Sequence, residues 1–244
     1  MGAYRDPDEA HIERLAAILR NVAPEKREEF FQKAIARIEA LSLRSPTSML
    51  TASDEQAFEL WRPIFQELFG FTPDFSLIKL PQAQGNLVLP ILMPGELVDS
   101  KGGFMERIFG ICKELFPSRK YGSNLDKSVT HNDRTPQNGS YAVRVGNHLK
   151  ATDGDEILKG LSANAIRQKN IATITLPERK MLEIYIYKTT GNHLDKHVWT
   201  LCSGSRDSGG FVPYAYWYGD AFYVGWCHPQ CAYPYLRGRS AVSC

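Results

Sequence analysis

The sequence predicts an α+β fold in which a mainly helical N-terminal region precedes a β-rich C-terminal domain. Apolar residues recur at helical spacing through much of residues 9–70 and again through 103–115. The polar stretch at 117–138 is the best candidate for a linker, and beyond it short apolar or alternating runs become the dominant pattern. Hydrophobic residues make up 43% of the chain and charged residues 23%, which is enough apolar mass for a core. We therefore divide the chain into a helical region at 1–116 and a second domain at 117–244.

The N-terminal region is expected to hold four helices, at residues 9–22, 24–41, 53–70 and 103–115. Pro24 suits the first turn of the second helix, because its missing N–H needs no partner there. Gly70 and Pro117 are typical of helix ends and close the last two. Between those two helices, short apolar runs at 75–80 and 87–93 predict strands.

The second domain begins with an alternating run at 140–145 that predicts a strand. Ser162 is expected to cap a short helix. Thr175-Leu176-Pro177-Glu178 has the composition of a capping box with a proline in the first turn, and it predicts a helix that ends near Gly191. The apolar run at 198–202 predicts a buried strand.

The tail at 207–244 uses a different set of amino acids from the rest of the chain. Lys, Glu and Met together number 33 in residues 1–206, and none occurs in the tail. The tail also holds 10 of the 27 aromatic residues and three of the five cysteines. Lys and Glu are common in average domains, so their absence needs a cause.

Bulky apolar residues alternate with tyrosines in this tail. If Val224 and Trp226 point inward, the two-residue period of a strand puts Tyr223, Gly225 and Cys227 on the opposite face. Tyrosine gives a large contact area at low entropic cost and adds a hydroxyl, so such a face is typical of a binding surface. The alternative is the aromatic core of a β-rich domain, and the pattern alone favours that alternative.

Composition excludes several classes of protein. The formal net charge of +2 gives no reason to expect nucleic-acid binding. The longest near-continuous apolar run, Leu87–Met93, is far shorter than the ~20 residues of a membrane helix, so no membrane span is expected. Residues 1–20 carry charges along their length and show no signal-peptide core. We therefore expect a cytoplasmic location by default, with reduced cysteines.

Three short motifs suggest metal binding, but each has a simpler interpretation. The CxxxC pair at 227–231 stands alone, whereas a zinc site needs about four ligands. In the HxDxH spacing at 193–197, Asp195 is expected to bond nearby backbone and order a turn. Asp153-Gly154-Asp155-Glu156 resembles part of a calcium loop and is expected to cap a following helix instead. We predict no metal, no cofactor and no catalytic residue.

The tail and the stretch before it carry the motifs of one known family. In the tail these are Cys202-Ser203-Gly204-Ser205-Arg206, Gly210, Val212-Pro213, Trp217, Val224, Trp226, Pro229 and Leu236-Arg237-Gly238-Arg239-Ser240-Ala241-Val242-Ser243. Upstream they are Gly139-Ser140-Tyr141-Ala142-Val143, Leu161-Ser162-Ala163-Asn164, Ile174-Thr175-Leu176-Pro177-Glu178-Arg179 and Thr190-Gly191-Asn192-His193-Leu194-Asp195. Together they resemble the variable proteins of diversity-generating retroelements, over about residues 121–244. Gly209, where family members often have Asp, and Cys244, beyond the usual terminal Ser, depart from the pattern.

In that family a reverse transcriptase copies a template repeat with errors at adenines, and the copy replaces the variable repeat. The resemblance implies a C-type lectin fold of the formylglycine-generating-enzyme subtype. Changing the adenines of AAC or AAT codons reaches most residue types but not Lys, Glu, Gln, Met or Trp. Within the tail only Trp217, Trp226 and Gln230 lie outside the reachable set. The tryptophans fall at fixed scaffold positions of the family, and Gln230 is interpreted as fixed or differently templated.

The resemblance implies a ligand-binding display protein rather than an enzyme, with a diversified segment at about 207–240. Its ligand would be a protein or a carbohydrate, and a reverse transcriptase and template repeat would be encoded nearby. The residues expected to face the ligand are Phe211, Tyr214, Tyr216, Tyr218, Tyr223, Gly225, Cys227, His228, Cys231, Tyr233 and Tyr235. The expected scaffold residues are Trp217, Val224, Trp226, Arg237 and Arg239.

Two other functions stay open. The formylglycine-generating relatives share the fold and use paired cysteines, so Cys227 and Cys231 suggest an oxidase, although both fall at positions expected to vary. The tail could instead be a structural or assembly interface that does not vary, with the N-terminal helices serving attachment.

Overall fold

The computed structural model describes residues 54–122, 124–148 and 153–244. The chain divides into two compact units, residues 1–45 and 46–244, and every described residue belongs to the second. The two helices predicted before residue 42 lie outside the described residues.

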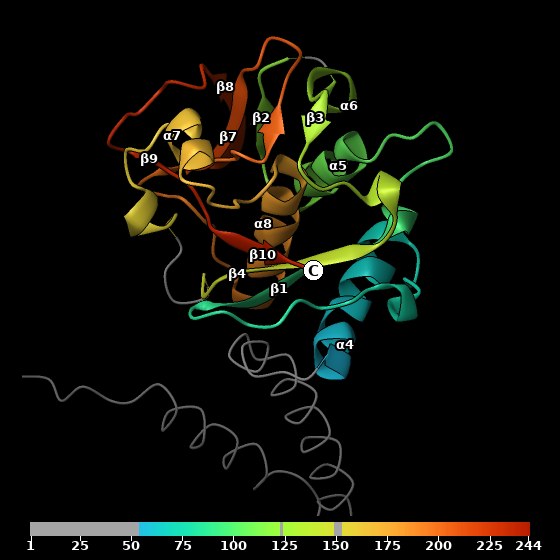
Figure 1. Ribbon diagram of the computed structural model, residues 1–244. Coiled ribbons are helices and arrows are strands. Elements are labelled where there is room, and N and C mark those ends of the chain that lie inside the picture. The colour runs from blue at the N-terminus through green and yellow to red at the C-terminus, as the bar shows by residue number, and fades with distance from the viewer. Residues whose placement is uncertain (1–53, 123, 149–152) are drawn as a thin grey trace, which may run out of the picture. The chain divides into compact units, whose positions relative to one another are not determined.

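The described chain is a mixed α+β structure with several sheets and five α-helices, as predicted for its fold class (Figure 1). The helices are α4 (Asp54–Ile64), α5 (Met105–Leu115), α6 (Leu125–Ser128), α7 (Ala163–Gln168) and α8 (Leu176–Thr190). The helix predicted at 53–70 is confirmed as α4, which continues as a π-helix at Phe65–Phe69. The prediction at 103–115 is confirmed as α5. Ser162 caps α7 as predicted, since its side chain accepts a hydrogen bond from the amide of Ala165.

Both ends of α8 follow from its sequence. The Thr175 hydroxyl accepts from the Glu178 amide at 3.4 Å, and the Glu178 carboxylate accepts from the Thr175 amide at 2.8 Å. The predicted capping box is therefore present. Gly191 ends the helix at φ +69°, a left-handed conformation that glycine adopts without strain.

Two larger sheets and one short ladder make up the β structure. The three-stranded sheet is antiparallel and has the order β1 (Leu87–Met93), β4 (Tyr141–Gly146), β10 (Ala241–Ser243). The five-stranded sheet has the order β2 (Ser118–Lys120), β8 (Ala221–Cys227), β7 (Val212–Tyr218), β5 (Trp199–Leu201), β9 (Leu236–Arg237). The ladder pairs β3 (His131–Asn132) with β6 (Ser205–Arg206). The strands predicted at 87–93, 140–145 and 198–202 are thus confirmed as β1, β4 and β5.

Two segments differ from expectation. The strand predicted at 75–80 is wrong, because Phe75–Leu77 form a 3₁₀ turn. The carboxylate of Asp74 accepts from both the amide and the hydroxyl of Ser76, at 3.0 and 2.6 Å, and this cap favours the turn over an extended strand. The polar stretch at 117–138 forms β2, α6 and β3 rather than an unstructured link.

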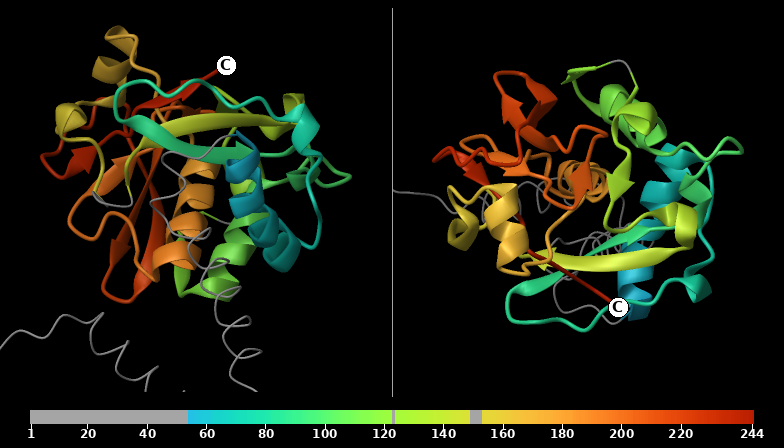
Figure 2. Two further views of the ribbon diagram at one scale, coloured as in Figure 1. Left: turned by 90° about the horizontal axis from the view of Figure 1, so that it is seen from below. Right: turned by 45° about the horizontal axis from the view of Figure 1, so that its top comes forward.

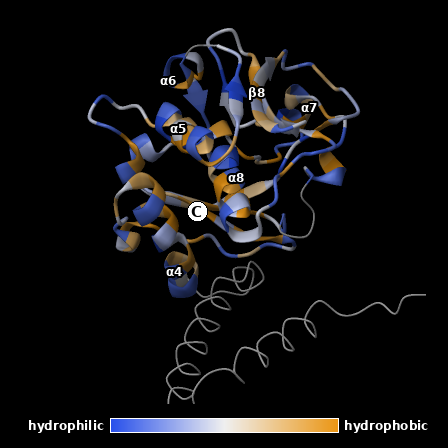
Figure 3. Ribbon diagram, turned by 180° about the vertical axis from the view of Figure 1, so that it is seen from behind, coloured by the Kyte–Doolittle hydropathy of each residue, from blue (hydrophilic) through white to orange (hydrophobic). Residues whose placement is uncertain are grey.

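One hydrophobic core joins the described elements, with α8 at its centre. All residues from 176 to 186 are buried, and Figures 1 and 2 show this helix beside β1 and β4 on one side and β7 on another. Trp61 of α4 stacks on Tyr185 of α8 with ring centroids 5.0 Å apart. Phe222 of β8 belongs to the same core, which is therefore continuous across residue 117. Figure 3 shows hydrophobic residues along α8 in the middle of the molecule.

Within the described residues, no helix has the length and apolar character that a membrane crossing requires.

Candidate binding face

The hairpin of β7 and β8 separates the tail residues into two sets. The strands pair antiparallel, with Tyr214 opposite Gly225 and Tyr216 opposite Tyr223. Because side chains alternate along a strand, these positions share one face of the five-stranded sheet, which we call the outer face. The residues between them point to the inner face: Pro213, Ala215, Trp217, Phe222, Val224 and Trp226.

The inner face packs on the core. Ala215, Phe222 and Val224 are fully buried. The indole of Trp217 is half-buried and stacks on the ring of His193, with centroids 3.4 Å apart and planes 11° from parallel. Trp226 is also half-buried, and its indole N–H donates to the carbonyl of Tyr121 at 3.2 Å. The structure therefore places the expected scaffold residues of this hairpin inward.

The outer face carries an aromatic ladder that crosses all five strands of the sheet. Its rungs are Tyr235 just before β9, Trp199 on β5, Tyr216 on β7, Tyr223 on β8 and the guanidinium of Arg119 on β2. Successive centroid distances along this order are 4.6, 4.5 and 5.3 Å between rings, and the guanidinium lies 5.7 Å from the last ring. Contacts between aromatic rings at such distances add about 0.5–1.5 kcal/mol each beyond area burial.

Tyr214 lies beside the ladder on the outer face, and its ring position requires the absence of a side chain at Gly225. A Cβ atom at that position would come within 2.6 Å of Cζ and of the hydroxyl oxygen of Tyr214. The tyrosine ring therefore lies across the glycine, and it also stacks on Trp199 at 4.7 Å. Burial raises the pKa of Tyr214 to about 12 and also raises that of Tyr216, so both phenols stay neutral and able to donate hydrogen bonds at physiological pH.

One end of the outer face is covered by α7. Leu201 and Val212 pack there with Ala163 and Ile166, and Cys227 contacts the same small cluster. Burial raises the pKa of Cys227 to about 12, with the neighbouring Cys231 as the next cause. The thiol of Cys227 is thus half-buried and protonated, which makes it a poor nucleophile.

The rest of the outer face and its margins are open. Within the described chain seven large hydrophobic residues are exposed, and five of them lie on or beside this face. Those five are Phe211, Tyr218, Tyr233, Tyr235 and Tyr121. Phe211 meets His228 edge-on at 5.6 Å, and Tyr233 stacks on Tyr235 at 5.3 Å. The expected ligand-facing residues therefore gather into one aromatic surface, with Cys227 at its covered end.

A buried group of charges fixes the end of the tail, and we call it the charge cluster: Arg179, Glu183, Asp195 and Arg239. Asp195 accepts from both arginines, at 2.8 Å from Arg179 and 2.5 Å from Arg239. Arg179 also pairs with Glu183 at 2.7 Å. Burial lowers the pKa of Arg239, and the charge of Asp195 opposes that effect. The scaffold position Arg239 thus holds the last strand to α8.

The same cluster accounts for the HxDxH spacing. Asp195 has a φ of +55°, and its carboxylate bonds the side chains of Arg179 and Arg239 instead of the nearby backbone that was expected. The ring of His193 donates from Nδ1 to the Glu183 carboxylate at 2.9 Å and stacks on Trp217. In the part of the chain that the structure describes, no three metal-ligating side chains converge.

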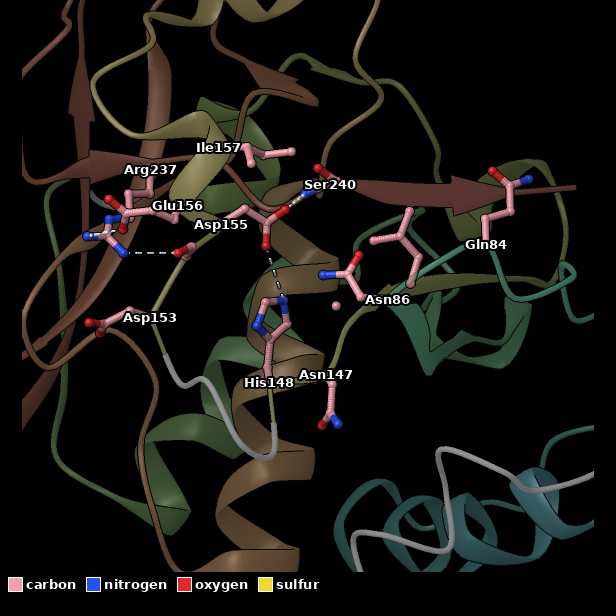
Figure 4. A pocket seen from close by; sticks show the side chains of 13 residues that line it. Gln84, Asn86, Asn147, His148, Asp153, Asp155, Glu156, Ile157, Arg237 and Ser240 are labelled. Carbon is pink, nitrogen blue, oxygen red and sulfur yellow. Dashed lines mark hydrogen bonds and ion pairs between the residues drawn. The ribbon is translucent and has the colours of Figure 1, made fainter.

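The segment Asp153–Glu156 holds Arg237, the other scaffold arginine. Glu156 pairs with it at 2.7 Å, and Gly154 approaches so closely that a Cβ there would lie 2.8 Å from Cβ of Arg237. The predicted helix cap is wrong: Asp155 precedes a 3₁₀ turn, but its carboxylate accepts from the amide of Ser240 at 2.6 Å. Figure 4 shows these contacts on the wall of a pocket of about 980 Å³. Asp155 and Glu156 therefore hold the end of the tail in place.

Comparisons with protein families, with curated proteins and with solved structures find no match to this chain.

Sequence reasoning missed three members of the outer face: Arg119, Tyr121 and Trp199. Trp199 was part of a run predicted as a buried strand, and alternation with Leu201 would have placed both beside the tyrosines. The other two lie in the polar stretch interpreted as a linker. Only the parallel pairing of β2 with β8 brings them to this sheet.

Proposed function

We propose that this protein is a ligand-binding display protein whose outer face is diversified by a retroelement reverse transcriptase through adenine mutagenesis. Its C-terminal domain would have a C-type lectin fold of the formylglycine-generating-enzyme subtype. The ligand is a protein or a carbohydrate, contacted through the aromatic outer face. It is not an enzyme.

One observation carries the proposal: the two faces of the β7–β8 hairpin differ in the residue types they hold. Every outer position of the hairpin holds a residue that adenine changes in AAC or AAT codons reach. Both tryptophans of the tail, which those changes do not reach, lie on the inner face. A fixed inner face supports a variable outer face because burial of large side chains contributes about 1.5–3 kcal/mol each whatever the outer residues are.

The geometry gives little support to an oxidase at Cys227 and Cys231. A catalytic thiol works as the thiolate, and burial holds the pKa of Cys227 well above physiological pH. An assembly subunit with a constant tail fits the same aromatic surface, so the experiment must distinguish variation from constancy.

Sequencing the gene across a population of the source provides that test. We expect substitutions concentrated at the outer positions such as Tyr214, Tyr216 and Tyr223, with Trp217 and Val224 constant. We also expect a near-copy of the tail's coding sequence beside a reverse-transcriptase gene. Substitutions spread evenly over both faces, or no such near-copy, would show that the tail is not diversified.

A further inference from the structure

The outer face contains residues that lie before the diversified segment and are therefore constant. Arg119 and Tyr121 alternate along β2 and its extension, so both side chains belong to the outer face next to Tyr223 and Gly225. Trp199 lies in the middle of the aromatic ladder, within 4.5–4.7 Å of Tyr214, Tyr216 and Tyr235. Adenine mutagenesis confined to about 207–240 leaves all three unchanged.

The rings of the ladder limit what the face recognises. Trp199, Tyr216 and Tyr223 meet one another nearly face to face, with planes 24–26° apart. Their faces are therefore covered, so these half-buried rings offer solvent mainly their edges, and the two tyrosines add hydroxyl groups. A pyranose ring binds aromatic residues by packing flat on an open ring face. Upright rings with exposed hydroxyls suit the mixed apolar and hydrogen-bonding surface of a protein better.

The positive charge of Arg119, at the end of the ladder, further limits the kind of ligand that the outer face suits. Arg119 is exposed, and within the described residues it forms no ion pair; its guanidinium lies over the ring of Tyr223. The tail contributes no lysine to this face. A guanidinium held against an aromatic ring keeps its N–H groups free for a carboxylate, and arginine binds carboxylates in a bidentate manner.

We propose that Arg119, Tyr121 and Trp199 form a constant part of the binding site, and that the ligand is a protein segment presenting a carboxylate beside apolar side chains. This inference rests on the proposed function. Arg119 takes the carboxylate in every variant, Tyr121 and Trp199 supply constant apolar contact, and the diversified residues select among partners of that kind.

The test uses the full-length chain as bait and, as probe, a yeast-displayed library of random peptides. We expect the enriched peptides to carry Asp or Glu next to aromatic or aliphatic residues. Arg119→Glu should weaken binding of those peptides by about tenfold or more and shift a fresh selection toward Lys and Arg. Lys79→Glu is the matched control, since Lys79 is also exposed but lies beside the C-terminal Cys244, and it should change nothing.

Substitutions at Trp199 test the constant apolar contact. Trp199→Ala should weaken binding of all enriched peptides, whereas Tyr218→Ala should weaken only some of them. Trp199→Phe retains a stacking ring and should restore much of the binding. This variant also tests whether a loss of binding in Trp199→Ala comes from misfolding. Enriched peptides without an excess of acidic residues, or binding unchanged in Arg119→Glu, would overturn the inference.

The control Tyr223→Ser separates this inference from the proposed function. If Tyr223→Ser abolishes binding while Arg119→Glu and Trp199→Ala do not, the outer face binds ligands but the constant part does not contribute. If none of the three variants alters binding, the outer face is not the binding site, and both proposals fail. Binding to neutral glycans on an array, without binding to any peptide, overturns the inference about the partner alone.

Discussion

The two faces of the β7–β8 hairpin differ in their surroundings, although the residues that form them alternate along the same strands. On the inner face, Phe222 and Val224 are fully buried in a core shared with α8. On the outer face, Tyr216 and Tyr223 contact mainly one another and their neighbours in the ladder. A two-residue period is therefore sufficient to separate residues that hold the fold from residues whose side chains stay outside the core.

Charge separates the faces as clearly as burial does. Behind the inner face lies the charge cluster, in which Asp195 holds Arg179 and Arg239 without access to water. The outer rows of β7 and β8 consist of neutral aromatic and small residues. Fixed charges in the interior orient the tail, whereas the outer rows of these two strands hold no charged residue whose substitution would break an ion pair.

Removing Asp195 should have the largest effect on stability. Asp195→Ala leaves two buried guanidinium groups without their shared carboxylate, and breaking a buried pair in this way costs about 3–5 kcal/mol. Urea unfolding followed by circular dichroism measures the loss.

Asp207→Ala is the matched control for that measurement. The Asp207 carboxylate accepts from the amides of Gly209 and Phe211 in a surface turn, so its loss should cost only about 1 kcal/mol. Equal losses in the two variants would mean that the charge cluster does not anchor the tail.

The neighbours Phe222 and Tyr223 test the two faces directly. Phe222→Ala opens a cavity at a fully buried site and should cost about 3–4 kcal/mol. Tyr223→Ala removes stacking on a half-buried ring and should cost about 1 kcal/mol. Both free energies of unfolding come from the same urea titrations, and a larger loss for Tyr223→Ala would invert the assignment of the faces.

Sequence patterns predicted the local parts of this architecture and failed where distant segments meet. The capping box at Thr175 and the placement of Val224 and Tyr223 on opposite faces of a strand depend only on residues a few positions apart. The structure has both as expected. The charge cluster joins α8 to Asp195 and to Arg239, which no local period connects. Likewise, only the sheet order β2-β8 shows that Arg119 lies beside Tyr223.

The smallest effect should also be the most specific, because it reverses sign. Gly225 has an ordinary extended backbone, where alanine is favoured over glycine by about 0.5–1 kcal/mol when space allows. With Tyr214 present, the new Cβ displaces that ring from its stack on Trp199, so Gly225→Ala should destabilise the protein by about 1 kcal/mol. In a Tyr214→Ser background the same substitution should stabilise it.

A double-mutant cycle in urea measures this coupling between the two positions, and additive effects would show that the ring does not depend on the glycine. The coupling also has a consequence for a diversified population. Chains that carry any side chain at position 225 should carry a residue smaller than tyrosine at 214, because the outer face holds only one of the two side chains in that space. Independent variation at 214 and 225 would contradict both the cycle and the geometry.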